Sequence, residues 1–109
     1  MTARERREQL LDVGRALFAE RGVEATSVEE IAARADVSKP VVYEHFGGKE
    51  GIYAVIVDRE VERLTSMLTA ALTPARHPKV IVEQAALALL DYIESNTDGF
   101  RILVRDSPV

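Results

Sequence analysis

Residues 26–46 read TSVEEIAARADVSKPVVYEHF, a stretch that predicts two short helices joined by a tight turn. Thr26 and Ser27 each offer a hydroxyl that can cap the first helix, and each is followed three residues later by a glutamate, as in a capping box. The apolar residues then recur at helical spacing, at Val28, Ile31, Ala32 and Ala35. This helix therefore buries a narrow face of small residues and leaves Glu29 and Glu30 in solvent.

The turn between the two helices falls at Asp36, a residue type that tolerates the left-handed backbone conformation. Ser38 is placed to cap the second helix, and Pro40 lies in its first turn, where a missing N–H costs little. Two helices joined in this way form a helix-turn-helix, whose second helix lies in the major groove of DNA. Double-stranded DNA is therefore the first partner to test.

From Leu10 to Ile52 the chain resembles the tetracycline-repressor (TetR) family of bacterial regulators. The matching elements follow one another in the family's order: Leu17-Phe18, Gly22, Thr26, Ile31-Ala32, Val37-Ser38, Tyr43-Glu44-His45-Phe46 and Lys49-Glu50. The chain departs from the family pattern at three positions. Asp36 stands where Gly is usual, Gly14 stands where Ala is usual, and Gly51 lies inside the start of a helix.

The resemblance implies an all-α protein with two parts. Residues 1–48 would be a three-helix DNA-binding domain, and residues 49–109 a connecting helix followed by an incomplete helical domain for regulation. The function implied is a ligand-responsive repressor that binds a palindromic operator as a homodimer and responds to a small-molecule effector, without a cofactor. The alternative is a helical protein-interaction module that keeps the fold and has lost DNA binding.

The remaining helices are predicted from periodicity and from helix-ending residues. A first helix spans about Ala3–Arg21, turns its apolar side inward and ends at Gly22. A long helix from Lys49 to about Leu72 extends for roughly 36 Å at 1.5 Å per residue. After a proline-bounded linker at 73–78 we expect a helix at 79–96, a turn at Thr97–Gly99 and a short helix from Phe100.

The helix expected at 79–96 is apolar around nearly its whole circumference. Such a helix is normally buried on all sides, yet only the long helix and a short final one are available to cover it. We therefore expect the sequence to be part of a longer regulator and this helix to carry an uncovered apolar face.

Composition excludes several classes of protein. The 109 residues contain no Cys, which rules out disulfides, thiolate metal sites and thiol nucleophiles and fits a reducing cytoplasm. The apolar runs are far shorter than the ~20 residues that span a bilayer, so we expect no membrane association. An enzyme is not expected, because no nucleophile stands beside a base and the glycines at 47–51 lack the spacing of a phosphate-binding loop. His45 and His77 do not make a zinc motif.

The overall charge does not by itself indicate a nucleic-acid binder. There are 14 Lys and Arg against 18 Asp and Glu, a net charge of −4, and residues 1–50 carry eight against ten. The argument for DNA therefore depends on where the cations lie. Five of them flank the expected groove-facing surface: Arg4, Arg6, Arg7, Lys39 and Lys49.

The second helix of the motif supplies the residues expected to read bases, namely Ser38, Lys39, Pro40, Val41 and Glu44. Lys39 can donate to guanine O6 or N7, or hold a phosphate, and the alternative is a solvated surface lysine. Val41 can contact a thymine methyl group, or pack on a neighbouring helix. Glu44 can accept from cytosine N4 and would be repelled by other surfaces of DNA.

Phosphate contacts are expected on both sides of that helix. Tyr43, His45 and Lys49 match family positions that bind phosphates, and Thr26 begins a helix whose N–H groups can do the same. For Tyr43 the alternative is a buried core residue, for His45 a structural role at the helix end, and for Lys49 a solvated lysine.

Overall fold

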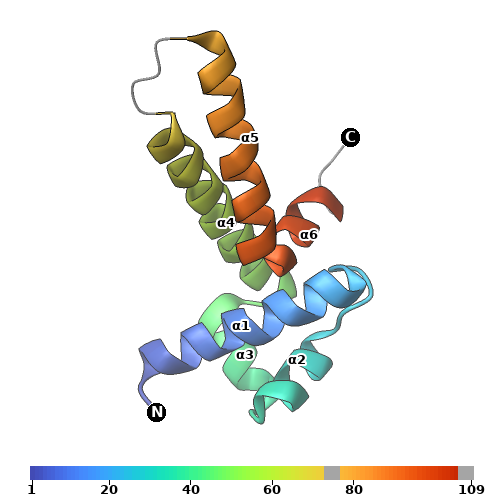
Figure 1. The fold of residues 1–109 in the computed structure, drawn as a ribbon. Helices are drawn as coiled ribbons and strands as arrows, with labels where there is room; N and C mark the ends of the chain where they lie inside the picture. The colour runs from blue at the N-terminus through green and yellow to red at the C-terminus, as the bar shows by residue number, and fades with distance from the viewer. Residues whose placement is uncertain (73–76, 106–109) are drawn as a thin grey trace.

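The computed structural model describes residues 1–72 and 77–105, and all the regular structure in these ranges is α-helical. The helices are α1 (Ala3–Arg21), α2 (Val28–Ala35), α3 (Lys39–Phe46), α4 (Lys49–Ala71), α5 (Pro78–Ser95) and α6 (Thr97–Arg105). Helices α1 to α3 form one end of the molecule, and α4 and α5 form an arm that rises from it (Figure 1). The predicted all-α fold class is confirmed. In the described part of the chain no helix is long and apolar enough to cross a bilayer.

The two ends of α1 follow from the residues beside them. Thr2 caps the helix and forms a reciprocal capping box with Glu5. At the other end Gly22 has φ 84°, and its N–H donates to the Phe18 carbonyl oxygen at 2.7 Å. The predicted helix, Ala3–Arg21, is confirmed.

The structure decides which hydroxyl caps α2. Ser27 is the cap, since its Oγ accepts from the N–H of Glu30 at 3.1 Å and the Glu30 carboxylate accepts from the N–H of Ser27. Thr26 is buried, and its hydroxyl donates to the Gly22 carbonyl oxygen at 2.8 Å. At the far end Asp36 adopts the left-handed conformation, φ 57° and ψ 47°, as predicted for the turn.

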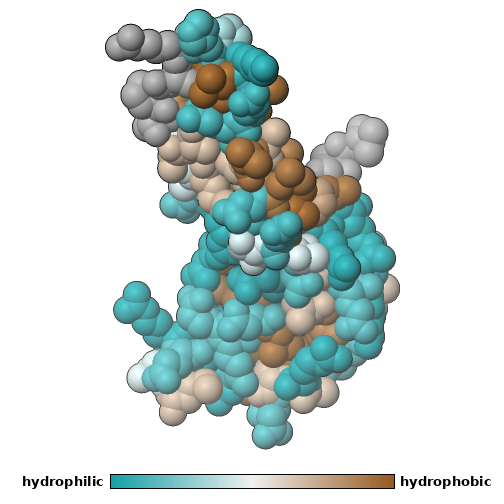
Figure 2. Space-filling view, in the orientation of Figure 1, coloured by the Kyte–Doolittle hydropathy of each residue, from teal (hydrophilic) through white to brown (hydrophobic). Residues whose placement is uncertain are grey.

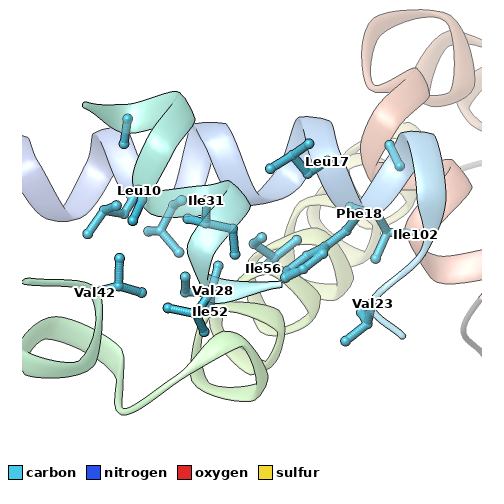
Figure 3. Packing of buried hydrophobic residues seen from close by; sticks show 14 residues of the cluster. Leu10, Leu17, Phe18, Val23, Val28, Ile31, Val42, Ile52, Ile56 and Ile102 are labelled. Carbon is cyan, nitrogen blue, oxygen red and sulfur yellow. The ribbon is translucent and has the colours of Figure 1, made fainter. Parts of the chain in front are cut away.

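A single apolar core joins α1, α2, α3 and the first turns of α4 (Figure 3). Leu10 and Phe18 of α1 meet Ile31 of α2, Val42 of α3 and Ile52 of α4, and all five are fully buried. Burial of one such side chain contributes about 1.5–3 kcal/mol. This core holds α3 by its inner side.

Two of the departures from the family pattern are places where α4 approaches its neighbours closely. A Cβ at Gly14 would lie 2.6 Å from Cγ2 of Ile52, so the glycine lets α1 and α4 pack together. A Cβ at Gly51 would overlap the carbonyl oxygen of Phe46 at the end of α3. Both glycines therefore fix how α4 packs on the end formed by α1 to α3.

The α4–α5–α6 contact centres on a buried carboxylate. Glu60 is fully buried, Tyr92 Oη donates to its Oε2 at 2.9 Å, and Arg63 Nη1 donates to its Oε1 at 2.7 Å. Burial, and then the hydrogen bond to Glu60, raise the pKa of the Tyr92 phenol. Gly99 of α6 packs on this carboxylate, which a Cβ would overlap.

The predicted turn at Thr97–Gly99 is wrong. Only Asn96 leaves the helical conformation, with φ −135° and ψ 50°, and α6 begins at Thr97. The N–H of Phe100 already donates to the Asn96 carbonyl oxygen at 2.9 Å. The sequence predicts a turn glycine at Gly99, but the missing side chain of this residue makes room for Glu60 inside a helix.

Helix α5 carries the uncovered apolar face that its sequence predicts. Val82, Leu87 and Leu90 are each more than half exposed, at 67%, 67% and 58%. Figure 2 shows apolar side chains gathered on this arm, above a mostly hydrophilic end formed by α1 to α3. Within the described residues, α5 packs on α4 and α6 only along one side.

Candidate nucleic-acid interface

Helix α3 presents one side to the core and the other to solvent. Val42 is fully buried, whereas Lys39, Pro40, Tyr43 and Glu44 are exposed. Ser38, the N-cap residue, is exposed as well and makes no side-chain cap bond, so its hydroxyl is available to a ligand. Val41 is half-buried, between the two sides. The alternative of a buried Tyr43 is excluded by its 46% exposure.

Lys39 has an anionic partner on the neighbouring helix. Its Nζ donates to Glu29 Oε1 of α2 at 2.5 Å and lies 5.8 Å from the centre of the Tyr43 ring. The hydrogen bond and the charge of Glu29 raise the pKa of Lys39, and the same hydrogen bond lowers the pKa of Glu29. Both side chains are largely exposed, so the pair is screened by solvent.

Lys49 is not a solvated lysine. Its Nζ donates to the backbone carbonyl oxygens of Val23 at 2.9 Å and Thr26 at 3.0 Å, and the side chain is half-buried. These bonds tie the start of α4 to the loop between α1 and α2. An ammonium group has three donors, so one N–H of Lys49 is left for another acceptor.

A cleft of about 390 Å³ opens between the start of α2 and the end of α3. Ser27, Tyr43, Gly48 and Lys49 line it. The first N–H groups of a helix have no intrahelical acceptor and carry partial positive charge, which makes such a cleft suited to a phosphate. Thr26 also lines the cleft, but its hydroxyl is used within the protein.

His45 and Arg7 meet at the end of α3. Arg7 Nη1 donates to the His45 carbonyl oxygen at 3.0 Å, and its guanidinium lies 4.4 Å from the centre of the Phe46 ring. The His45 ring is half-buried and tilted by 43° against Phe46. Arg7, expected only as a flanking cation, therefore also stabilises the end of α3, where a cation is favoured by the helix dipole.

Arg6 is likewise engaged within the protein, through Gln9. Arg6 Nη1 donates to Gln9 Oε1 at 2.6 Å, and Gln9 Nε2 donates to the carbonyl oxygen of Ala35 at 3.0 Å. Arg4 is exposed. Of the five flanking cations, four thus have protein partners in the described residues. The residue pattern did not indicate the partners of Arg7, Lys39 and Lys49, because these partners are backbone carbonyl oxygens or a residue on another helix.

Comparison with known proteins gives this geometry its context. The family model described as "Bacterial regulatory proteins, tetR family" matches residues 10–56, which hold the helix-turn-helix and the seat of α4. Residues 10–56 belong to the TetR family. The HTH-type transcriptional activator FasR of Mycolicibacterium smegmatis is 37% identical over 105 residues, which cover 96% of this chain and 48% of FasR.

Solved structures of TetR-type regulators have the same arrangement of helices. The ketosteroid transcriptional regulator KstR2 of Mycobacterium tuberculosis superposes with a TM-score of 0.85 at 27% identity, over 93% of this chain and 52% of that one. The SmeT–triclosan complex superposes with a TM-score of 0.71 at 28% identity, over 96% and 52%. The chain thus spans about half the length of the TetR-family proteins that it matches.

Proposed function

We propose that the protein is a transcriptional regulator that binds double-stranded DNA through α3. The observation that carries the proposal is the two-sided environment of this helix, with Val42 in the core and a row of mostly polar side chains exposed on the opposite side. A helix held in this way can enter a major groove without losing its packing. The match of residues 10–56 to the TetR family supports the same function.

The exposed side of α3 supplies the base contacts in this proposal. Lys39 donates to guanine or to a phosphate, Glu44 accepts from cytosine N4, and the half-buried Val41 offers its free methyl surface to thymine. Ser38 and Pro40 lie at the start of the helix, where it comes closest to the bases.

Phosphate contacts fix the register of α3 on either side. The cleft at the start of α2 takes one phosphate between its N–H groups, the Tyr43 hydroxyl and the remaining N–H of Lys49. His45, on the last turn of α3, is placed for a second phosphate contact. Thr26 contributes by burying its side chain and so fixing the start of α2.

We propose that the regulator acts as a homodimer in the cytoplasm, with two copies of α3 on a palindromic operator. A small-molecule effector would change the separation of the two helices by binding one arrangement better than the other. The triclosan complex of SmeT supports an effector of this kind. We propose repression as the mode of regulation, although FasR is named as an activator, and a reporter gene placed behind the selected operator measures the sign.

Selection from a random DNA pool, followed by titration of the selected duplex at several salt concentrations, tests the proposal. A phosphate-binding protein loses affinity steeply as salt rises, with log–log slope about −0.9 for each phosphate contact. We expect a palindromic consensus and a slope of several units. A protein-interaction module with the same fold would yield no consensus and no slope, and that outcome would refute DNA binding.

A further inference from the structure

The pair formed by Glu29 and Lys39 links two helices on the proposed DNA-facing surface. The residues are ten apart in sequence, and Glu29 Oε1 accepts from Lys39 Nζ at 2.5 Å. Both side chains reach solvent, at 63% and 48% exposure. Each therefore lies where a DNA phosphate could approach, and Lys39 meets that phosphate already paired with a carboxylate.

Glu29 lies in the first turn of α2, directly after Val28 and the cap residue Ser27. The hydrogen bond from Lys39 contributes most to lowering the pKa of its carboxylate. The same helix end would offer its N–H groups to a phosphate. A DNA phosphate that approaches this end of α2 therefore meets a carboxylate that is already paired with Lys39.

The surrounding charge strengthens this competition. Glu24, Glu29 and Glu50 all line the cleft, and Lys49, its one lining cation, directs two of its three donors to backbone carbonyls. A carboxylate that keeps Lys39 from the phosphates, and that itself repels them, makes DNA binding weaker than the cations alone would allow.

We propose that Glu29 is an affinity-setting residue, whose carboxylate competes with DNA phosphates for the ammonium group of Lys39. The inference rests on the proposed DNA-binding function and adds to it a residue that lowers the affinity for DNA. A regulator with high affinity for every sequence would be bound mostly to non-operator DNA, because sequence-independent binding is largely electrostatic. Glu29 lowers that background by giving Lys39 a partner within the protein.

The test compares Glu29→Gln with Glu24→Gln, which removes the same charge from the same cleft. Glu24 is exposed and makes no ion pair with any described residue. Dissociation constants are measured by fluorescence anisotropy for the selected operator and for an unrelated duplex. We expect Glu29→Gln to tighten binding to both by about two- to fivefold, the range of an exposed ion pair, and Glu24→Gln by less than a factor of about two.

A second comparison shows whether the effect passes through Lys39. In a Lys39→Met background, Glu29→Gln is expected to tighten binding by less than a factor of about two, because the ammonium group for which Glu29 and the phosphates compete is absent. Equal gains from Glu29→Gln and Glu24→Gln, a full gain without Lys39, or weaker binding by Glu29→Gln would each overturn the inference. Failure of the proposed function is a different result, in which the unaltered chain shows no salt-dependent binding to any duplex.

Discussion

The residues of α3 that are proposed to contact bases differ in what they can recognise, and Lys39 and Val41 offer two different tests of base preference. Lys39→Ala is expected to relax selection at one base pair by about 1–3 kcal/mol if a bidentate contact to guanine is lost, and Val41→Ala to relax another by less. Selection profiles from a random pool measure both. Glu62→Ala, an exposed change on α4, serves as the control. Profiles that stay the same for both α3 variants would contradict the assignment of α3 as the reading helix.

Lys49 is expected to affect both stability and affinity, because its ammonium group already serves two backbone carbonyls. Lys49→Met keeps most of the side chain and removes the donors, and should lower the free energy of unfolding by about 2 kcal/mol and weaken binding to all sequences alike. Tyr43→Phe, which loses only a hydroxyl, should also weaken binding to all DNA sequences to the same extent, and it should leave thermal stability nearly unchanged. A changed operator preference at undiminished affinity in either variant would show that these residues do not bind phosphates.

The packing of α4 against the end of α3 depends on Gly51 more than on Gly47. Gly51→Ala should cost more than about 3 kcal/mol, because the Phe46 carbonyl oxygen that the new methyl group would meet is backbone and cannot turn aside. Gly47 has φ 75° and nothing within 4 Å of a Cβ, so Gly47→Ala should cost only about 1 kcal/mol for its conformation. Urea unfolding of the two variants measures the difference. A Gly51→Ala variant as stable as the Gly47→Ala variant would contradict the close approach of α3 and α4.

The contact of α4 with α5 and α6 gives a pH-dependent expectation for Tyr92. Its pKa is raised in the fold, chiefly by burial and then by Glu60, so the fold favours the neutral phenol. The stability that this provides is complete below the unfolded pKa of about 10 and is lost as the pH rises above it. Tyr92→Phe should be less stable than the unaltered chain at pH 7 by about 1–3 kcal/mol, and the gap should narrow above pH ~10.

Urea unfolding between pH 7 and pH 11 measures this gap. Tyr43→Phe is the matched control, since Tyr43 is exposed and does not contact Glu60. A constant gap across the range would show that the phenol is not held neutral by the fold.

At the scale of the whole molecule, the uncovered face of α5 predicts association of the 109-residue chain. Large exposed apolar patches are unusual on monomers, and Leu87 and Leu90 contribute little to the fold because they are mostly exposed. Leu87→Gln combined with Leu90→Gln should reduce association in sedimentation equilibrium without lowering the melting temperature. Leu17→Gln, a change to a residue only 1% exposed, should lower the melting temperature by contrast. Unfolding of the double variant would mean that these leucines belong to a core.

The sequence predicted the elements whose signals are local. The C-terminal end of α1 follows from a glycine, and the turn at Asp36 from a residue that tolerates the left-handed conformation, both visible in the chain. The misplaced turn at Thr97–Gly99 has another cause, because Gly99 is required by Glu60, which lies 39 residues earlier. Contacts between distant elements leave no local pattern.

The same reason limits the prediction of the site. The exposed residues of α3 could be named from helical spacing, and the exposure of Lys39, Pro40 and Glu44 agrees with that expectation. The partners of Arg7 and Lys49 could not, since they are backbone carbonyls, which every residue has. Ser27 and Thr26 gave equal signals for a cap, and only the burial of Thr26 against Gly22 separates them.

The three glycines at which α4 meets its neighbours limit which substitutions this sequence can accept during evolution. Gly14, Gly51 and Gly99 belong to three different helices, and any side chain at these positions would overlap a group across a contact that α4 makes. Every substitution of glycine adds at least one carbon atom, so no conservative replacement exists at any of the three. We therefore expect substitutions on the exposed surface of the arm but not at these three glycines. The direction in which α4 leaves the DNA-binding end is kept because these positions have no side chain.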